Sequence, residues 1–322
     1  MRPRSFTPAP GLSNPHLQTI WPFLVRRWRS VPLARERLEL PDGDFLDLDW
    51  AGGNSGPVTV IIHGLEGCSG SAYVQGLMRA LALDGQRSVA MHFRGCSGPP
   101  NRLPRSYCAG ETNDIGQAVR HIRRRTGDEP LFVVGYSLGG NALLNWLAAT
   151  EDGAGVDGAV AVSVPFLLRE AANRMGSGAS KLYQWYFLNR LKTSYRRKFG
   201  SRNDAPVPLE SLPRLGNFFD FDNAVTAPLH GYRDVDDYYA RASCRQRLGA
   251  IGIPTLILHA IDDPFMTPLA VPRRDELSPA VTLELTAHGG HVGFVGGTVL
   301  KPQYWLEERI LRFLQQVADA KT

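Results

Sequence analysis

Cysteine is scarce in this chain of 322 residues, and so are long apolar runs. The four cysteines are Cys68, Cys96, Cys108 and Cys244. They form no CxxC pair and no zinc-like spacing, so neither a disulfide framework nor a cysteine metal site is expected. The longest apolar stretch, 159–168, is about half of a membrane span and contains Ser163 and Pro165. Together with the lack of an apolar signal-peptide core, this predicts a cytoplasmic protein in a reducing compartment.

A strong charge of either sign is lacking as well. The net charge is +5, and a content of 43% hydrophobic and 21% charged residues is typical of a folded protein. Two basic runs, 121–125 and 195–198, are interpreted as solvated helix faces, with weak contact with an anionic membrane surface as the alternative. No nucleic-acid motif accompanies them, so no nucleic-acid partner is predicted. Nothing indicates an obligate protein partner.

The order of apolar and amphipathic segments predicts the fold class. Residues 1–34 are rich in proline and are expected to be irregular, and residues 38–50 have the alternation of a β-hairpin. Buried strands are then expected at 58–63, 88–93, 131–136, 159–164, 255–260 and 281–286. Helices are expected at 71–83, 113–125, 138–149 and 305–317. This pattern predicts an α/β fold with a mostly parallel central sheet and helices on both faces.

Residues 166–250 interrupt the alternation and are rich in arginine and aromatic side chains. We expect them to form a helical cap on a core made of residues 1–165 and 251–322. In open α/β sheets ligands bind beyond the carboxyl ends of the strands, where such an insertion would lie. The cap is therefore expected to wall an apolar acyl pocket, while most of its aromatic residues pack a small core of their own.

The strand at 131–136 runs directly into Gly135-Tyr136-Ser137-Leu138-Gly139 and then into a helix. Gly-x-Ser-x-Gly alone is a weak pattern, because glycine and serine are common in ordinary turns. Between a strand and a helix it is typical of a nucleophile elbow, in which a strained turn exposes the serine hydroxyl. Ser137 is therefore a candidate nucleophile, with a plain turn serine as the alternative.

A serine nucleophile needs a base and an orienting acid, and α/β-hydrolases supply the acid first and the histidine last. Asp262 and Asp263 follow the strand at 255–260, so either one is a candidate acid, and the other would cap the next turn. His288 and His291 follow the strand at 281–286. Glycines on both sides of His291 favour it as the base, and His288 is interpreted as structural.

The first parallel strand is followed by His63-Gly64-Leu65-Glu66-Gly67, in the position of an oxyanion loop. In this fold the oxyanion is bound by an N–H of that loop and by the N–H after the nucleophile. These donors would be Leu65 and Leu138, and the alternative is a glycine-rich turn with no catalytic role. Glu66 is expected to be solvated or hydrogen-bonded within the loop. No phosphate-binding motif or metal-ligand spacing is present, so no cofactor is predicted.

Taken together, these motifs identify a family resemblance that covers nearly the whole chain. They are Asn14–Ile20, His63–Gly67, Phe93–Gly98, Asn101-Arg102, Gly135–Asn141, Asp262–Phe265 and His288–Phe294. With them the chain resembles the YheT-like branch of the α/β-hydrolases, which is related to the mammalian ABHD lipases. The resemblance implies a triad of Ser137, Asp263 and His291. One departure is Tyr107-Cys108-Ala109-Gly110, where the family pattern has Tyr-His-Ser-Gly.

The expected function is that of a serine carboxylic-ester hydrolase that forms a covalent acyl-enzyme. The resemblance implies small-molecule ester substrates with short or medium acyl chains, or small lipids, and a place in lipid metabolism. Transfer of the acyl group to an alcohol by the same acyl-enzyme is one alternative. A non-catalytic ligand-binding module is another, against which the complete triad argues. The elbow alone also leaves peptidase and haloperoxidase-like activities open.

Overall fold

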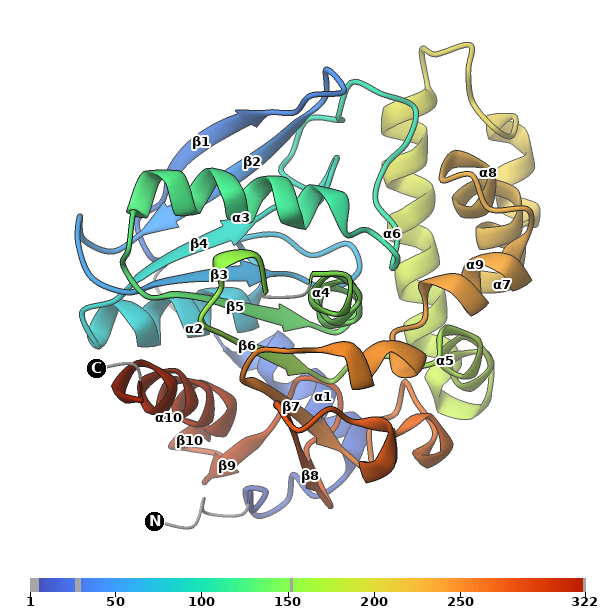
Figure 1. The fold of residues 1–322 in the computed structure, drawn as a ribbon. Helices are drawn as coiled ribbons and strands as arrows, with labels where there is room; N and C mark the ends of the chain where they lie inside the picture. The colour runs from blue at the N-terminus through green and yellow to red at the C-terminus, as the bar shows by residue number, and fades with distance from the viewer. Residues whose placement is uncertain (1–5, 27–29, 151–152, 321–322) are drawn as a thin grey trace.

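The protein is described here from a computed structural model, and the structure describes residues 6–26, 30–150 and 153–320. An eight-stranded sheet in the order β1-β2-β4-β3-β5-β6-β7-β8 forms the centre of the molecule (Figure 1). Its strands are β1 (Ala34–Glu39), β2 (Phe45–Ala51), β3 (Val58–Ile62), β4 (Arg87–Met91), β5 (Leu131–Tyr136), β6 (Gly158–Val162), β7 (Thr255–Ala260) and β8 (Val281–Thr286). Strands β3 to β8 pair in parallel, and β1 and β2 add an antiparallel hairpin at one edge. The predicted fold class is confirmed.

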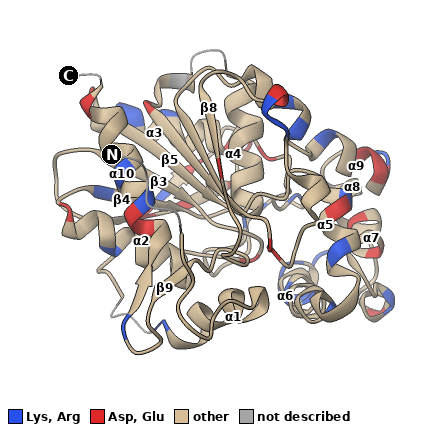
Figure 2. Cartoon of the chain, turned by 90° about the horizontal axis from the view of Figure 1, so that it is seen from below, with Lys and Arg blue, Asp and Glu red and all other residues tan. Residues whose placement is uncertain are grey.

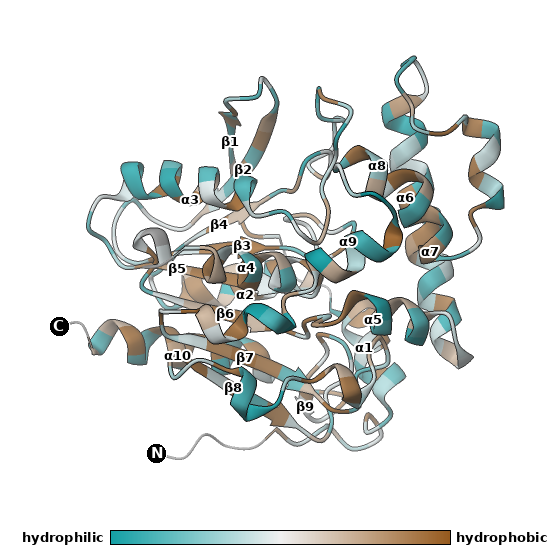
Figure 3. Ribbon diagram, turned by 45° about the vertical axis from the view of Figure 1, so that its right-hand side comes forward, coloured by the Kyte–Doolittle hydropathy of each residue, from teal (hydrophilic) through white to brown (hydrophobic). Residues whose placement is uncertain are grey.

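Helices cover both faces of the sheet, as buried parallel strands require. On one face α3 (Asn113–Thr126) and α4 (Leu138–Ala148) share an apolar core with the sheet. On the other face the core is shared with α2 (Ala72–Leu83) and α10 (Trp305–Asp319). Figure 3 shows the hydrophilic outer turns of α3 in teal and the hydrophobic strands beneath the helices in brown.

The proline-rich N-terminal segment is not irregular throughout, which corrects the expectation for residues 1–34. It contains α1 (Pro15–Val25). The side chain of Asn14 accepts hydrogen bonds from the N–H groups of His16 and Leu17, at 2.9 and 3.3 Å. Proline at the first helical position costs nothing, since its missing N–H has no partner there anyway. The buried Gln18 side chain donates to the carbonyl of Val295 at 3.0 Å and so fixes α1 to the C-terminal part of the chain.

Two short strands near the C-terminus were also not expected. They are β9 (Val295–Gly297) and β10 (Pro302–Tyr304), which pair antiparallel outside the main sheet. Gln18 holds the start of this hairpin, because its side-chain oxygen accepts from the N–H of Val295 at 2.7 Å. The hairpin therefore connects α1 to the loop that follows β8.

The residues between β6 and β7 are helical and lie beyond the carboxyl ends of the strands, on the right of Figure 1. Their α-helices are α5 (Leu168–Met175), α6 (Lys181–Phe199), α7 (Phe218–Phe221), α8 (Ala227–Leu229) and α9 (Val235–Ala242). Seven aromatic side chains of this segment are buried in a separate apolar cluster: Tyr183, Tyr195, Phe199, Phe218, Phe221, Tyr238 and Tyr239. We call residues 166–250 the cap, and its exact boundaries stay a prediction.

Within the described residues, no helix combines the length and the apolar character needed to cross a membrane. The cytoplasmic location expected from the sequence stays a prediction.

Candidate active site

Ser137 occupies the sharp turn between β5 and α4, with a φ of 53°. Its N–H donates to the carbonyl of Val162 on the neighbouring strand at 2.8 Å. The flanking glycines are required for close approach. A Cβ on Gly135 would lie 2.7 Å from the carbonyl oxygen of Gly139, and one on Gly139 would lie 2.3 Å from that of His63. A non-glycine residue in this left-handed conformation is strained, which is typical of functional sites.

Three of the candidate residues lie in one hydrogen-bonded row. Nε2 of His291 lies 2.9 Å from Oγ of Ser137, and Nδ1 of the same ring lies 2.8 Å from Oδ2 of Asp263. Asp263 is buried, and its other oxygen accepts from the N–H of Phe265 at 2.9 Å. This is the arrangement in which a histidine can take a proton from a serine while a carboxylate orients the ring.

The other aspartate and histidine pair with each other, away from Ser137. Asp262 lies 3.2 Å from Nδ1 of the exposed His288 and accepts from the N–H of Gly290 at 2.9 Å. These contacts join the loop that follows β7 to the loop that follows β8. The structure thus brings Asp263 and His291 to Ser137 and leaves Asp262 and His288 apart from it.

Residues far away in the sequence hold the loop that carries His291. The hydroxyl of Thr19 on α1 accepts from the N–H of His291 at 2.9 Å, and that of Ser163 accepts from the N–H of Val292 at 3.1 Å. The ring of Phe265 stacks on the imidazole, with centroids 3.9 Å apart and an angle of 14°. The sequence analysis assigned no role to these supports, although Thr19 and Phe265 both lie within the motifs that carry the family resemblance.

The predicted oxyanion donors border the same cavity as Ser137. The N–H groups of Leu65 and Leu138 donate to no acceptor among the described residues. Both leucines line the cavity. The buried His63 holds the loop. Its Nδ1 lies 2.8 Å from the carbonyl of Gly64, and its Nε2 accepts from the N–H of Phe93 at 3.2 Å. Burial lowers the pKa of His63 to about 3, so the ring is neutral and can both donate and accept.

Glu66 bonds outside its own loop, which corrects the expectation of a solvated or locally bonded side chain. The Tyr107 hydroxyl accepts from the N–H of Glu66 at 2.8 Å and donates to its carboxylate at 2.9 Å. The Ser194 hydroxyl, on α6, donates to the other carboxylate oxygen at 2.6 Å. Burial raises the pKa of Tyr107, so its hydroxyl remains a donor. Tyr107, the first residue of the segment 107–110 whose role the sequence left open, therefore holds the loop at 63–67 in place.

A cavity of about 170 Å³ lies between the sheet edge and the cap. Ser137, Leu138 and His291 line it from the core side. From the cap it is lined mainly by apolar side chains, which include Phe187, Leu191, Phe218, Phe221 and Val225. An apolar cavity of about 150 Å³ holds a benzene-sized molecule, so this one has room for a short acyl chain.

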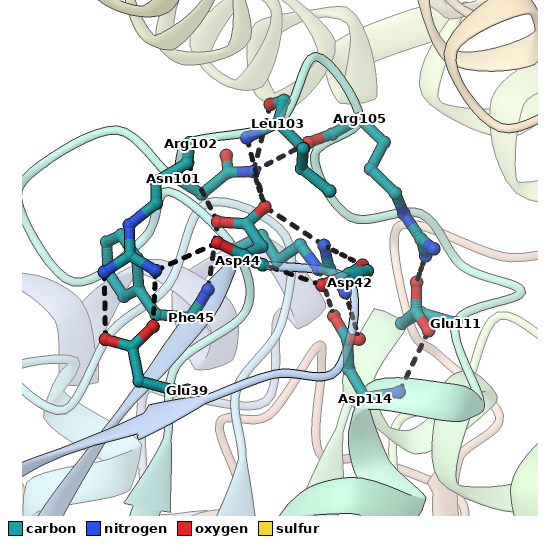
Figure 4. Close-up of polar contacts among 12 residues, drawn as sticks. Glu39, Asp42, Asp44, Phe45, Asn101, Arg102, Leu103, Arg105, Glu111 and Asp114 are labelled. Carbon is teal, nitrogen blue, oxygen red and sulfur yellow. Dashed lines mark hydrogen bonds and ion pairs between the residues drawn. The ribbon is translucent and has the colours of Figure 1, made fainter.

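A buried guanidinium supports one wall of this cavity. Arg94 forms a two-pronged ion pair with Asp114, with both contacts at 2.7 Å, and also meets Asp44 at 3.0 Å. Figure 4 shows Asp44 at the centre of a polar cluster that also holds Asn101 and Arg102. Removing one partner of such a buried pair leaves an uncompensated charge, which is strongly destabilising. The motif around Arg94 is thereby explained as structural.

The same cluster reaches the cap through Lys198. Its Nζ donates to the side-chain oxygen of Asn101 at 2.7 Å and to the carbonyl of Arg105 at 2.6 Å. Burial is the main cause that lowers the pKa of Lys198 to about 7. Lys198 is thus a contact between α6 and the loop at 101–105 that weakens when the amine loses its charge.

Asn141 joins three segments behind the nucleophile. Its side-chain nitrogen donates to the carbonyls of Ala109 and Ala242, each at 2.8 Å, and its oxygen accepts from the N–H of Cys244 at 3.1 Å. The end of the cap is thereby fixed to α4, next to Ser137.

The described residues contain no group of three or more His, Cys, Asp or Glu side chains that could hold a metal ion.

Comparisons with known proteins agree with the fold. Residues 57–298 match the family model described as alpha/beta hydrolase fold. YheT of Escherichia coli K12 is 46% identical over 98% of this chain and 95% of its own length. Phospholipase ABHD3 of Mus musculus is 27% identical over 96% of this chain and 80% of its own length. The esterase Pf2001 of Pyrococcus furiosus superimposes with a TM-score of 0.58 at 15% identity, covering 90% of this chain and 96% of that one.

Proposed function

This chain is an esterase- or lipase-like member of the α/β-hydrolase fold family, and we propose that Ser137, His291 and Asp263 are its catalytic triad. The observation that carries the proposal is the row of contacts at 2.9 and 2.8 Å from serine through imidazole to carboxylate. A serine hydroxyl is a weak nucleophile, and a base within hydrogen-bond reach activates it.

In the first half of the reaction, Oγ of Ser137 attacks the ester carbonyl while Nε2 of His291 takes its proton. Asp263 holds Nδ1–H and stabilises the cation that forms on the ring. The negative charge on the carbonyl oxygen is bound by the N–H groups of Leu65 and Leu138. His291 then protonates the leaving alcohol, and the acyl group stays on Ser137.

In the second half, His291 takes a proton from water, and the resulting hydroxide attacks the acyl-enzyme. Collapse of the second tetrahedral intermediate releases the acid and returns the proton to Ser137. The apolar lining of the cavity supports acyl esters or small lipids as substrates, because a buried alkyl chain gains free energy for each methylene removed from water. The cavity of about 170 Å³ favours short to medium chains.

A panel of p-nitrophenyl esters with graded acyl lengths tests this function. The wild type should cleave the shorter esters and Ser137→Ala should not, while both proteins remain folded by circular dichroism. Adding an alcohol during turnover separates hydrolysis from acyl transfer, since a transferase would form mainly the new ester. Equal rates for wild type and Ser137→Ala would refute the proposal.

A further inference from the structure

Large apolar side chains are exposed on the outer faces of α1 and α6. Phe23 and Leu24 on α1 are 66% and 62% exposed, and Leu182 and Trp185 on α6 are 59% and 63% exposed. We call these four residues the α1–α6 patch. Figure 2 shows the two helices next to each other. The ring of Phe23 lies 6.1 Å from that of Tyr186, edge to face, so the helices are in contact here.

The inner faces of the same helices build the candidate active site. Thr19 on α1 accepts from the N–H of His291, and Phe187 and Leu191 on α6 line the acyl cavity. Scattered exposed apolar residues are normal on a protein surface. Several of them on two adjoining helices beside a cavity indicate an interaction surface instead. A partner on the α1–α6 patch would therefore lie next to the cavity.

The charge of α6 indicates which kind of partner fits. The helix carries no acidic residue and six basic ones, of which Lys198 is bound to the loop at 101–105; the other five are Lys181, Arg190, Lys192, Arg196 and Arg197. Arg190 donates to the carbonyl of Glu66 at 2.9 Å and Arg197 to that of Gly95 at 3.0 Å. Carbonyls carry no net charge, so neither bond cancels the charge of a guanidinium, although the nearby Glu66 carboxylate partly offsets that of Arg190. A helix with Trp and Leu outward among Lys and Arg is typical of binding to anionic lipid.

A second copy of this chain fits the patch less well, because two α6 helices would bring like charges together. A protein partner fits less well where α6 carries Lys181 and Lys192, because lysine is depleted at protein interfaces. We therefore propose that the α1–α6 patch docks the protein on an anionic lipid surface.

A groove leads from the patch toward the acyl cavity. Trp185, Arg190 and Arg197 line it from α6. Glu66 and Ser194 line both the groove and the cavity, so the two spaces adjoin. When the patch is docked, the mouth of the groove faces the lipid head groups, and an ester at the surface can reach Ser137 without crossing bulk water.

Vesicle flotation tests the docking, and it needs no turnover. The probes are phosphatidylcholine vesicles with and without about one-third phosphatidylglycerol, at low and high salt. The wild type should float with the anionic vesicles only, and salt should reduce the binding. The variant Phe23→Asp with Leu182→Asp should lose it. The control Leu83→Asp should keep it, because Leu83 is 78% exposed but ends α2, at the sheet edge away from Ser137.

Two further double variants test how much the positive charge of α6 contributes to vesicle binding. Lys181→Gln with Arg196→Gln on α6 should weaken binding to anionic vesicles roughly thirtyfold, since each basic residue near the surface contributes about fivefold. Arg120→Gln with Arg124→Gln removes the same charge from α3 and should leave binding unchanged.

Three results would overturn the docking proposal. They are equal binding to neutral and anionic vesicles, undiminished binding of the Phe23 and Leu182 variant, and a dimer in sedimentation analysis that this variant abolishes. Cleavage of a water-soluble acetyl ester should be normal in that variant. The outcome is thereby independent of the proposed chemistry, which Ser137→Ala tests separately.

Discussion

Oδ2 of Asp263 lies 2.8 Å from Nδ1 of His291, although Asp262, its neighbour in the chain, binds His288 instead. One carboxylate is thus buried beside the imidazole of His291, and the other is half-buried beside the exposed His288. The two aspartates therefore form a natural pair for a test of the triad.

Asp263→Asn should lower kcat roughly 10⁴-fold, because an amide stabilises the wrong imidazole tautomer. Asp262→Asn should cost at most about tenfold, through loosening of the turn that carries His291. Steady-state kinetics on one soluble ester, with thermal unfolding to show that both variants fold, measures this. A larger loss of kcat in Asp262→Asn than in Asp263→Asn would show that Asp262, not Asp263, is the acid of the triad.

Tyr107→Phe should lower kcat about tenfold to a hundredfold and change KM little. The hydroxyl of Tyr107 holds both the N–H and the carboxylate of Glu66, so its loss frees the loop that carries the Leu65 donor. Tyr195→Phe is the matched control. Tyr195 also lines the cavity, but its hydroxyl bonds only to the N–H and the carbonyl of Val207, so it contacts neither the loop at 63–67 nor Ser137. Equal losses of kcat in the two variants would show that the effect is one of general stability.

Phe221→Ala should shift the preferred acyl chain to greater length. Phe221 lines the cavity, and its neighbour Phe219 on the same helix does not. Each further methylene that the enlarged cavity accepts should improve kcat/KM roughly fourfold, which corresponds to about 0.8 kcal/mol. The ester panel measures the shift, and Phe219→Ala should leave the length preference unchanged. Identical profiles for both variants would mean that the cap does not select the acyl chain.

Asp222→Asn should alter how stability depends on pH. The Asp222 carboxylate accepts from the hydroxyls of Thr226 and Tyr239 at 2.6 and 2.7 Å inside the cap, and burial raises its pKa from 3.8 to about 6. The folded state thus binds the proton more tightly than the unfolded state, so the wild type loses stability as the pH rises from about 4 through 6.

Asparagine at position 222 cannot ionise. Relative to the wild type, the free energy of unfolding of Asp222→Asn should therefore rise by up to about 3 kcal/mol between pH 4 and pH 7. Urea unfolding of both proteins across this range measures the difference. A constant difference at every pH would show that Asp222 does not titrate in the cap.

The sheet and the serine elbow could be predicted because their signals are local. Apolar runs of strand length fix the strands, and Gly135 and Gly139 are explained by the close approach of strand and helix around Ser137. The order of serine, acid and histidine follows from the strands that precede them. These features need no knowledge of distant contacts.

The supports of the site could not be predicted, because they depend on contacts between distant segments. Thr19 meets His291 across 272 positions of the chain, and Tyr107 meets Glu66 across 41. Helix α1 was missed since its prolines are typical of irregular segments, although one lies at the first helical position and Asn14 caps the helix. The choice between Asp262 and Asp263 depends on the orientation of one turn, for which spacing carries no signal.

Covalent labelling with a fluorophosphonate tests the central claim most directly. Intact mass spectrometry of the wild type should show one adduct, and peptide mapping should place it on Ser137. Ser106→Ala, which removes another serine that lines the cavity, should label as the wild type does. Ser137→Ala should give no adduct. An adduct of the same yield on Ser137→Ala would contradict the account, because the nucleophile would then lie elsewhere.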